Sequence, residues 1–90
     1  MVKIIEVKPL PEFILFIRYN DGVEGIQDLK NLFKNYKLSQ KEFENVWVEN
    51  KCGGMPTWNN DIQIDALKPY LDFTNQSFEQ YIEKERQNVA

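Results

Sequence analysis

The chain is predicted to fold as a small α+β domain, built from a curved antiparallel sheet with short helices in the order β-β-β-α-α-β-β-α. Two apolar segments of strand-like composition flank an Asn-Asp-Gly turn, which is typical of a β-hairpin. The spacing of apolar residues then changes from 2 to 3.6, which indicates helices. Ninety residues support one modest core. We therefore expect one domain, with residues 1–72 as its body and 73–90 as a C-terminal helix that frays at its end.

Two strands are predicted before the turn. Lys3–Leu10 is rich in β-branched residues and is bounded by prolines, which end a strand. Phe13–Tyr19 is apolar on both alternating faces, which is typical of a central strand. One face carries Phe13, Leu15, Ile17 and Tyr19, and the other carries Ile14 and Phe16.

The turn at residues 20–22 leaves two registers open. A two-residue loop would place Ile17 opposite Ile26, whereas a three-residue loop with a glycine bulge would place Arg18 opposite Glu24. We favour the second register, because glycine accepts the positive φ that the bulge requires.

Two helices are predicted after the third strand, Val23–Asp28. Asp28 can cap the first helix. Its apolar residues, spaced as on one helical face, are Leu29, Leu32, Phe33 and Tyr36. Ser39 and Glu42 can form a capping box that begins the second helix, with Leu38 stapled to Phe43.

The second half of the chain is predicted to hold a second hairpin and two helical segments. Val46–Val48 and Met55–Trp58 read as strands, and Pro56 weakens the latter or places it at an edge. Ala66–Leu71 has room for one to two helical turns. Thr74–Ser77 opens a terminal helix.

The composition argues against an enzyme. Histidine is absent, so the commonest general base and zinc ligand are missing. The only cysteine, Cys52, has no partner for an internal disulfide and no histidine to activate it. Asn59, Asn60, Asp61 and Asp65 do not match the rhythm of a calcium-binding loop. We expect no catalytic residue, no metal and no cofactor; a small enzyme that acts through Asp61 or Asp65 stays as a less favoured alternative.

Charge and hydropathy restrict the partners. Residues 1–41 carry seven Lys/Arg and five Asp/Glu (+2), and residues 42–90 carry four and nine (−5). The sequence has no apolar run of the length that a membrane helix or a signal peptide requires, so a cytoplasmic protein is expected. Another small protein is the expected partner, nucleic acid is disfavoured, and a homo-oligomer is compatible with the sequence.

An exposed strand edge, which can accept another chain through main-chain hydrogen bonds, is one expected binding surface. Three groups of side chains are further candidate surfaces, each beside a structural alternative. The first is Trp58, Asn59, Asn60 and Asp61, where core packing and turn formation are favoured over recognition. The second is the terminal helix with Phe78, Tyr81 and Ile82 on one side, which can dock on a basic partner or fold back on its own sheet. The third is a lysine stripe, for which a solvated flank is favoured over an acidic partner or a phosphate backbone; it comprises Lys30, Lys34, Lys37 and Lys41.

Two stretches, VKPLPEFILFIRYNDGVEGIQDL and TWNNDIQIDAL, carry a family resemblance. The chain resembles the bacterial family described as domain of unknown function 2442. The resemblance implies a compact α+β fold and an interaction role, as an antitoxin-like partner or adaptor of a co-encoded small protein. Asn59-Asn60 departs from the proline, asparagine and glycine typical of that family. Some relatives carry a helix-turn-helix after this domain; the residues printed after Leu71 are fewer than such a motif needs, so DNA binding by that route is not expected.

Overall fold

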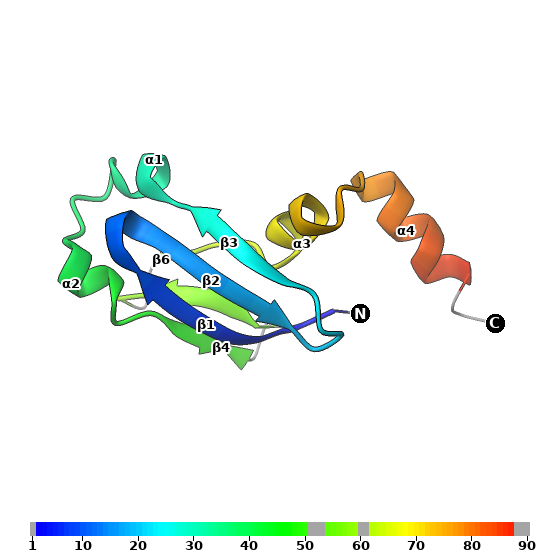
Figure 1. The fold of residues 1–90 in the computed structure, drawn as a ribbon, viewed down its shortest axis with the longest axis horizontal. Helices are drawn as coiled ribbons and strands as arrows, with labels where there is room; N and C mark the ends of the chain where they lie inside the picture. The colour runs from blue at the N-terminus through cyan, green and yellow to red at the C-terminus, as the bar shows by residue number, and fades with distance from the viewer. Residues whose placement is uncertain (1, 51–53, 60–61, 88–90) are drawn as a thin grey trace.

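The computed structural model describes residues 2–50, 54–59 and 62–87, which form two three-stranded antiparallel sheets and four α-helices (Figure 1). The strands are β1 (Ile4–Leu10), β2 (Ile14–Tyr19), β3 (Glu24–Asp28), β4 (Trp47–Glu49), β5 (Met55–Trp58) and β6 (Ile62–Gln63). The helices are α1 (Lys30–Phe33), α2 (Gln40–Phe43), α3 (Leu67–Thr74) and α4 (Phe78–Gln87), with a 3-10 turn, η1, at Pro11–Phe13. The α+β class is confirmed, although the strands divide between two sheets and β6 was not expected.

The first sheet has the order β1-β2-β3, so β2 is central, as predicted. Arg18 lies opposite Glu24, which confirms the register of the three-residue loop. Gly22 adopts a φ of 93°, and the Tyr19 N–H donates to the Val23 carbonyl at 2.8 Å. A glycine at this position closes the hairpin without the strain that a side chain would introduce.

The two faces of β2 have different surroundings. Leu15, Ile17 and Tyr19 are 0% exposed and belong to one buried cluster with residues of β5 and the helices. Ile14 and Phe16 point the other way and are only partly buried. The prediction that both faces are apolar is therefore right, but only one of them is covered.

The second sheet has the order β4-β5-β6 and contains the second predicted hairpin. Contrary to the prediction, Pro56 lies in the central strand rather than at an edge. β6 is so short that it pairs only with Thr57 and Trp58, and the Ile64 N–H donates to the Pro56 carbonyl. Pro56 thus uses its acceptor on that side, near the start of the strand, where a missing N–H is tolerated.

One side chain of α2 holds the corner between β1 and β2. At η1, Glu12 and Phe13 have φ values of 64° and 60°, which interrupts the regular pairing of the two strands. The Gln40 Oε1 accepts from the Phe13 N–H at 3.1 Å, and its Nε2 donates to the Leu10 carbonyl at 3.0 Å. Gln40 thereby satisfies two backbone groups that the corner exposes.

The predicted first helix is shorter than expected. α1 ends at Phe33, and Lys37 adopts a left-handed φ of 51°. Phe33 is buried as predicted, but Leu32 and Tyr36 are exposed. The capping box of α2 is confirmed, because the Ser39 Oγ accepts from the Glu42 N–H and the Glu42 carboxylate accepts from the Ser39 N–H.

α3 and α4 follow one another at one end of the molecule (Figure 1). α3 runs to Thr74, so the boundary placed at residues 72/73 falls inside it. A second capping box begins α4: the Ser77 Oγ accepts from the Gln80 N–H, and the Gln80 Oε1 accepts from the Ser77 N–H. None of the helices in the described ranges is long and apolar enough to cross a bilayer.

Candidate functional site

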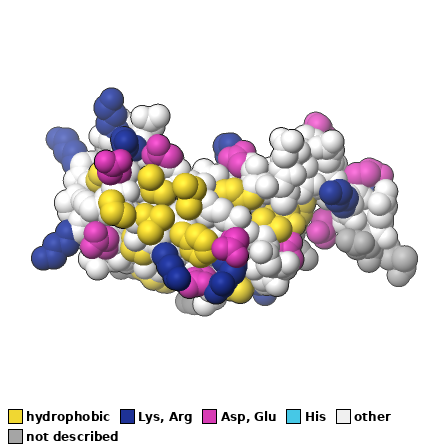
Figure 2. Space-filling model, viewed as in Figure 1, with side chains coloured by type: hydrophobic (Ala, Val, Ile, Leu, Met, Phe, Trp, Pro, Cys, Tyr) yellow, Lys and Arg dark blue, Asp and Glu magenta, His cyan; other side chains and the backbone are white. Residues whose placement is uncertain are grey.

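The surface that we name the outer face is the side of the first sheet opposite the core. Directly paired residues of an antiparallel sheet point to the same side. The outer face therefore consists of three cross-strand rows: Glu6, Arg18 and Glu24; Lys8, Phe16 and Ile26; Leu10, Ile14 and Asp28. Figure 2 shows apolar side chains gathered over β1 to β3 on the side facing the viewer.

The apolar centre of the outer face is open to solvent. Ile26 is 59% exposed, and Phe16, Ile14 and Leu10 are half-buried. The Lys8 ammonium lies 5.7 Å from the centre of the Phe16 ring, within the range of a cation–π contact. No described helix or strand packs over this centre in Figure 1. A contiguous apolar patch of this kind is a feature of surfaces that bind other molecules.

Charged side chains border the apolar centre on two sides. Glu6 forms an ion pair with Arg18 and lies 3.5 Å from the Lys8 ammonium. Glu24 and Asp28 are both exposed on β3, one on either side of Ile26. The side of the outer face near β1 thus carries one acidic and two basic side chains, whereas its β3 border is acidic.

The free edge of β3 adjoins the outer face. Leu29 N–H donates to the Phe13 carbonyl at one end of the β2–β3 pair, as Tyr19 N–H does to the Val23 carbonyl at the other. Hydrogen-bonded pairs alternate with non-bonded pairs along such a ladder. The backbone N–H and C=O groups of Glu24, Ile26 and Asp28 therefore point away from β2, and no described residue bonds to them.

α3 supports β3 from the inner side and leaves this edge open. The Phe73 ring lies where a Cβ on Gly25 would come within 2.7 Å of it. The Gln27 Nε2 donates to the Asp72 carboxylate at 3.3 Å. Gly25 and Gln27 both point to the inner side, opposite to Ile26, so these contacts fix β3 without covering its outer face.

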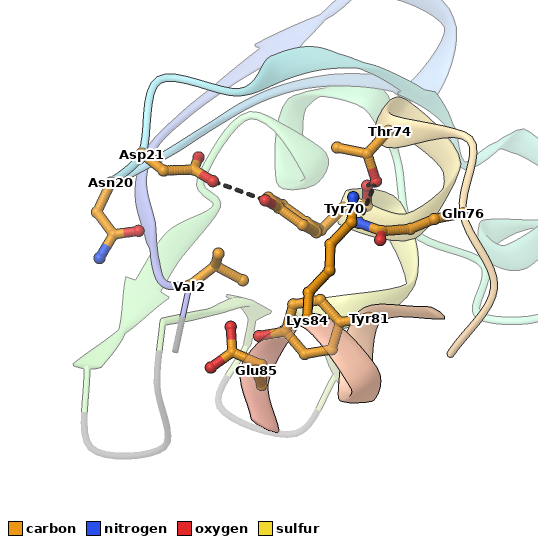
Figure 3. Close-up of a pocket in the computed structure, with 9 residues that line it drawn as sticks. All are labelled: Val2, Asn20, Asp21, Tyr70, Thr74, Gln76, Tyr81, Lys84 and Glu85. Carbon is orange, nitrogen blue, oxygen red and sulfur yellow. Dashed lines mark hydrogen bonds between the residues drawn. The ribbon is translucent and has the colours of Figure 1, made fainter. Parts of the chain in front are cut away.

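A cleft of about 430 Å³ lies beside the turn that joins β2 to β3 (Figure 3). It is lined by Val2, Asn20, Asp21, Tyr70, Thr74, Gln76, Tyr81, Lys84 and Glu85. The Tyr70 hydroxyl donates to the Asp21 carboxylate at 2.7 Å, which is the main reason that the pKa of Tyr70 is raised to about 12. Burial is the main cause of the raised pKa values of Tyr19 and Tyr81. These hydroxyls are therefore protonated near neutral pH, and those of Tyr70 and Tyr19 donate hydrogen bonds to the Asp21 carboxylate and the Ala66 carbonyl.

Of the four residues predicted around Trp58 as a surface site, the structure describes Trp58 and Asn59, and Trp58 is not on the surface. Trp58 is 0% exposed, stacks on Phe43 with ring centres 5.5 Å apart, and donates from its Nε1 to the Phe43 carbonyl. A partner cannot reach this ring in the folded chain. Asn59 is exposed with a φ of 52°, as a turn residue would be, and Asn60, Asp61 and Cys52 lie outside the described residues.

The predicted residues of α4 divide between two surroundings. Tyr81 is buried against Tyr70, with ring centres 5.8 Å apart, so this side of the helix packs on its own chain. Phe78 is 56% exposed and Ile82 is half-buried. These two line a shallow groove of about 220 Å³ with Glu79, Glu83 and Arg86. The helix therefore presents a small apolar strip outside its internal contact.

The four lysines of the predicted stripe lie on different elements. Lys30 is in α1, Lys34 caps its end, Lys37 is in the following turn and Lys41 is in α2. All four are exposed, and Lys30 lies 4.0 Å from the Glu12 carboxylate. The stripe thus loses the continuous helix on which it was predicted, and binding to nucleic acid stays a prediction without geometric support.

Metal binding has no structural basis in the described ranges, where no three Cys, Asp or Glu side chains are grouped as ligands. The Asp65 carboxylate instead accepts from the Leu67 N–H at the start of α3, which is a structural role. An exposed strand edge was predicted as a binding surface, but the outer face was not. Its only sign in the sequence is the apolar pair Ile14 and Phe16, which was assigned to a central strand. Comparison of the chain with protein-family models, curated proteins and solved structures finds no match in any of the three.

Proposed function

We propose that the chain is a non-catalytic protein-interaction module of the cytoplasm, which binds a small partner protein through the outer face. One observation carries this proposal: the central strand of the first sheet is apolar on both sides, and only its inner side is covered. A chain that leaves Phe16 and Ile26 on an open sheet gains no core stability from them, whereas a partner that covers them removes their apolar area from water.

The biological role that fits this surface is that of an antitoxin-like partner or adaptor of a co-encoded small protein, as the resemblance to domain of unknown function 2442 implies. The cleft beside Tyr70 supports this role over catalysis. Its tyrosines are held protonated, and Asp21 already accepts from Tyr70. We therefore assign binding to the outer face and no reaction to the cleft.

The test is a titration of the purified chain with the product of the neighbouring gene, in which isothermal calorimetry measures the heat of binding. We expect a stable complex with the wild-type chain and its loss in Phe16→Asp, because the variant removes the apolar ring at the centre of the outer face and puts a charged group in its place. Phe78→Asp is the matched control, since Phe78 is an exposed aromatic residue on α4. Circular dichroism of each variant would establish that it is folded.

Two results would contradict the proposal. Loss of the complex in Phe78→Asp but not in Phe16→Asp would move the binding surface to α4. Absence of any complex with the wild-type chain would count against a co-encoded partner and leave the antitoxin-like role without support.

A further inference from the structure

We infer that the β3 edge accepts an extended strand of the partner whose exposed side chains alternate basic, aliphatic, basic. This inference rests on the proposed interaction function and names the chemistry of the partner. Its first basis is the backbone: the N–H and C=O groups of Glu24, Ile26 and Asp28 point away from β2 and have no bond from a described residue. Such an edge can pair with another strand through main-chain hydrogen bonds.

The side chains of β3 give the edge its selectivity. Glu24, Ile26 and Asp28 point to the outer face and are all exposed. An antiparallel strand added here would place its own side chains directly opposite these three. An aliphatic residue opposite Ile26 would extend the row that Phe16 begins, and lysine or arginine on each side would meet the two carboxylates.

The surroundings of this edge add to its negative charge. Asp72 of α3 lies beside β3, where it accepts from Gln27, and its carboxylate is 3.5 Å from the Lys68 ammonium. Glu24, Asp28 and Asp72 carry three negative charges, against Lys68 and Lys30, and the Lys30 ammonium lies 4.0 Å from the Glu12 carboxylate. Arg18, which lies opposite Glu24 on β2, is already paired with Glu6. The local field therefore favours a cationic strand.

A second copy of the chain is a poor occupant of this edge. Antiparallel self-pairing centred on Ile26 would place Glu24 of one copy opposite Asp28 of the other, and like charges directly opposite are destabilising. A shift of two residues would set an acid against Ile26. Residues 24–28 contain no basic side chain, so no register gives a complementary pair.

The binding test uses two synthetic heptapeptides. The Lys peptide has the sequence Thr-Lys-Thr-Val-Thr-Lys-Thr, and the Glu peptide has glutamate in place of both lysines. In a titration followed by 1H–15N spectra, we expect the Lys peptide to shift the amide signals of Glu24, Ile26 and Asp28 and to slow solvent exchange of the Ile26 amide. The Glu peptide should leave these signals unchanged.

Two variants separate charge from backbone pairing. Glu24→Lys combined with Asp28→Asn should weaken binding of the Lys peptide about 2- to 30-fold, as expected for the loss of two cross-strand charge pairs. Asparagine keeps the side-chain oxygen that accepts from the Lys30 N–H. Ile26→Pro removes an outward N–H that the sheet does not use, so it should abolish binding while the chain remains folded. Glu83→Lys, which reverses the charge of an exposed acid on α4, is the control for the added positive charge and should bind as the wild type does.

Equal binding of the two peptides, or unchanged binding of the Lys peptide by the β3 variants, would overturn the inference. Signal shifts confined to the cleft or to α4 would do the same. These outcomes are separate from failure of the proposed function. A partner protein that requires Phe16 but binds Ile26→Pro as tightly as the wild type would support the outer face and exclude strand addition.

Discussion

The inner and outer faces of the first sheet are formed by alternate residues of the same three strands, yet the inner face is buried in the core and the outer face is open to solvent. On β2 the inner residues Leu15, Ile17 and Tyr19 are 0% exposed. On β3 the outward Ile26 is 59% exposed, although isoleucine is a residue type usually found in cores. Periodicity identifies which residues share a face, but only the tertiary arrangement decides which face is covered. An apolar face without a cover is thus a property of the whole chain rather than of one strand.

The largest expected effect on stability concerns Trp58, whose ring lies in the core below the inner face of the first sheet. Trp58→Ala should lower the free energy of unfolding by about 3–5 kcal/mol, because it empties the centre of the aromatic cluster and removes the bond to Phe43. Urea unfolding would measure this loss. Trp47→Ala is the control, since Trp47 is 41% exposed and should cost much less. Equal losses in the two variants would mean that Trp58 is not at the centre of the core.

A matched pair of isoleucines tests the two faces directly. Ile17→Ala should destabilise the chain by about 2–5 kcal/mol, because it leaves a cavity in a fully buried position. Ile26→Ala should cost less than about 1 kcal/mol, since its side chain is already in contact with water. Chemical denaturation of both variants gives the comparison. A large loss for Ile26→Ala would show that the outer face is covered in solution.

Gly25→Ala sharpens the comparison at the contact between β3 and α3. The new methyl group would lie 2.7 Å from the Phe73 ring, so the ring or α3 must shift, and we expect a loss of about 1–3 kcal/mol in the free energy of unfolding. In a Phe73→Leu background the same change should cost less, because the smaller side chain leaves room. A thermal double-mutant cycle measures this coupling. Strictly additive losses would exclude the contact.

Tyr70→Phe tests the hydrogen bond that ties α3 to the first hairpin. We expect a loss of about 1 kcal/mol at neutral pH, because Asp21 loses its donor. The pKa of Tyr70 in the folded chain is raised to about 12 from 10. The stabilisation is therefore fully present below pH 10 and disappears as the pH rises through 12, so the difference between wild type and variant should shrink over this range.

Thermal melts at several pH values would follow this difference. Tyr36→Phe is the control, because Tyr36 is exposed and should not show the pH-dependent loss. A difference between wild type and Tyr70→Phe that stays constant across the alkaline range would mean that the hydrogen bond to Asp21 does not account for the lost stability.

Local patterns predicted much of the fold because their physics is local. The hairpin register at Gly22 and the capping box of Ser39 and Glu42 each depend on a few adjacent residues. The first helix was predicted too long, because the apolar spacing that includes Leu32 and Tyr36 continues past the end of α1. The edge at Pro56 was predicted wrongly, because the short β6 could not be recognised from a two-residue pairing.

The candidate surface was beyond prediction for a different reason. Phe16 was assigned with Ile14 to one apolar face of a central strand, and the exposure of that face depends on α3 lying on the inner side of the sheet. The cleft likewise joins Asp21 to Tyr70 across 49 positions of the chain. Contacts of that separation leave no periodic signal in the sequence.

Gln40 illustrates how narrow the chemical choice at one polar position can be. Its amide serves the Phe13 N–H and the Leu10 carbonyl at once, across 27 and 30 positions of the chain. A carboxylate would repel the carbonyl, an ammonium would repel the N–H, and a shorter amide would not span both. We therefore expect substitutions of Gln40 to be tolerated less than those of most polar residues. Because its contacts are distant in sequence, we also expect the β1–β2 corner to become ordered late in folding, after α2 has docked.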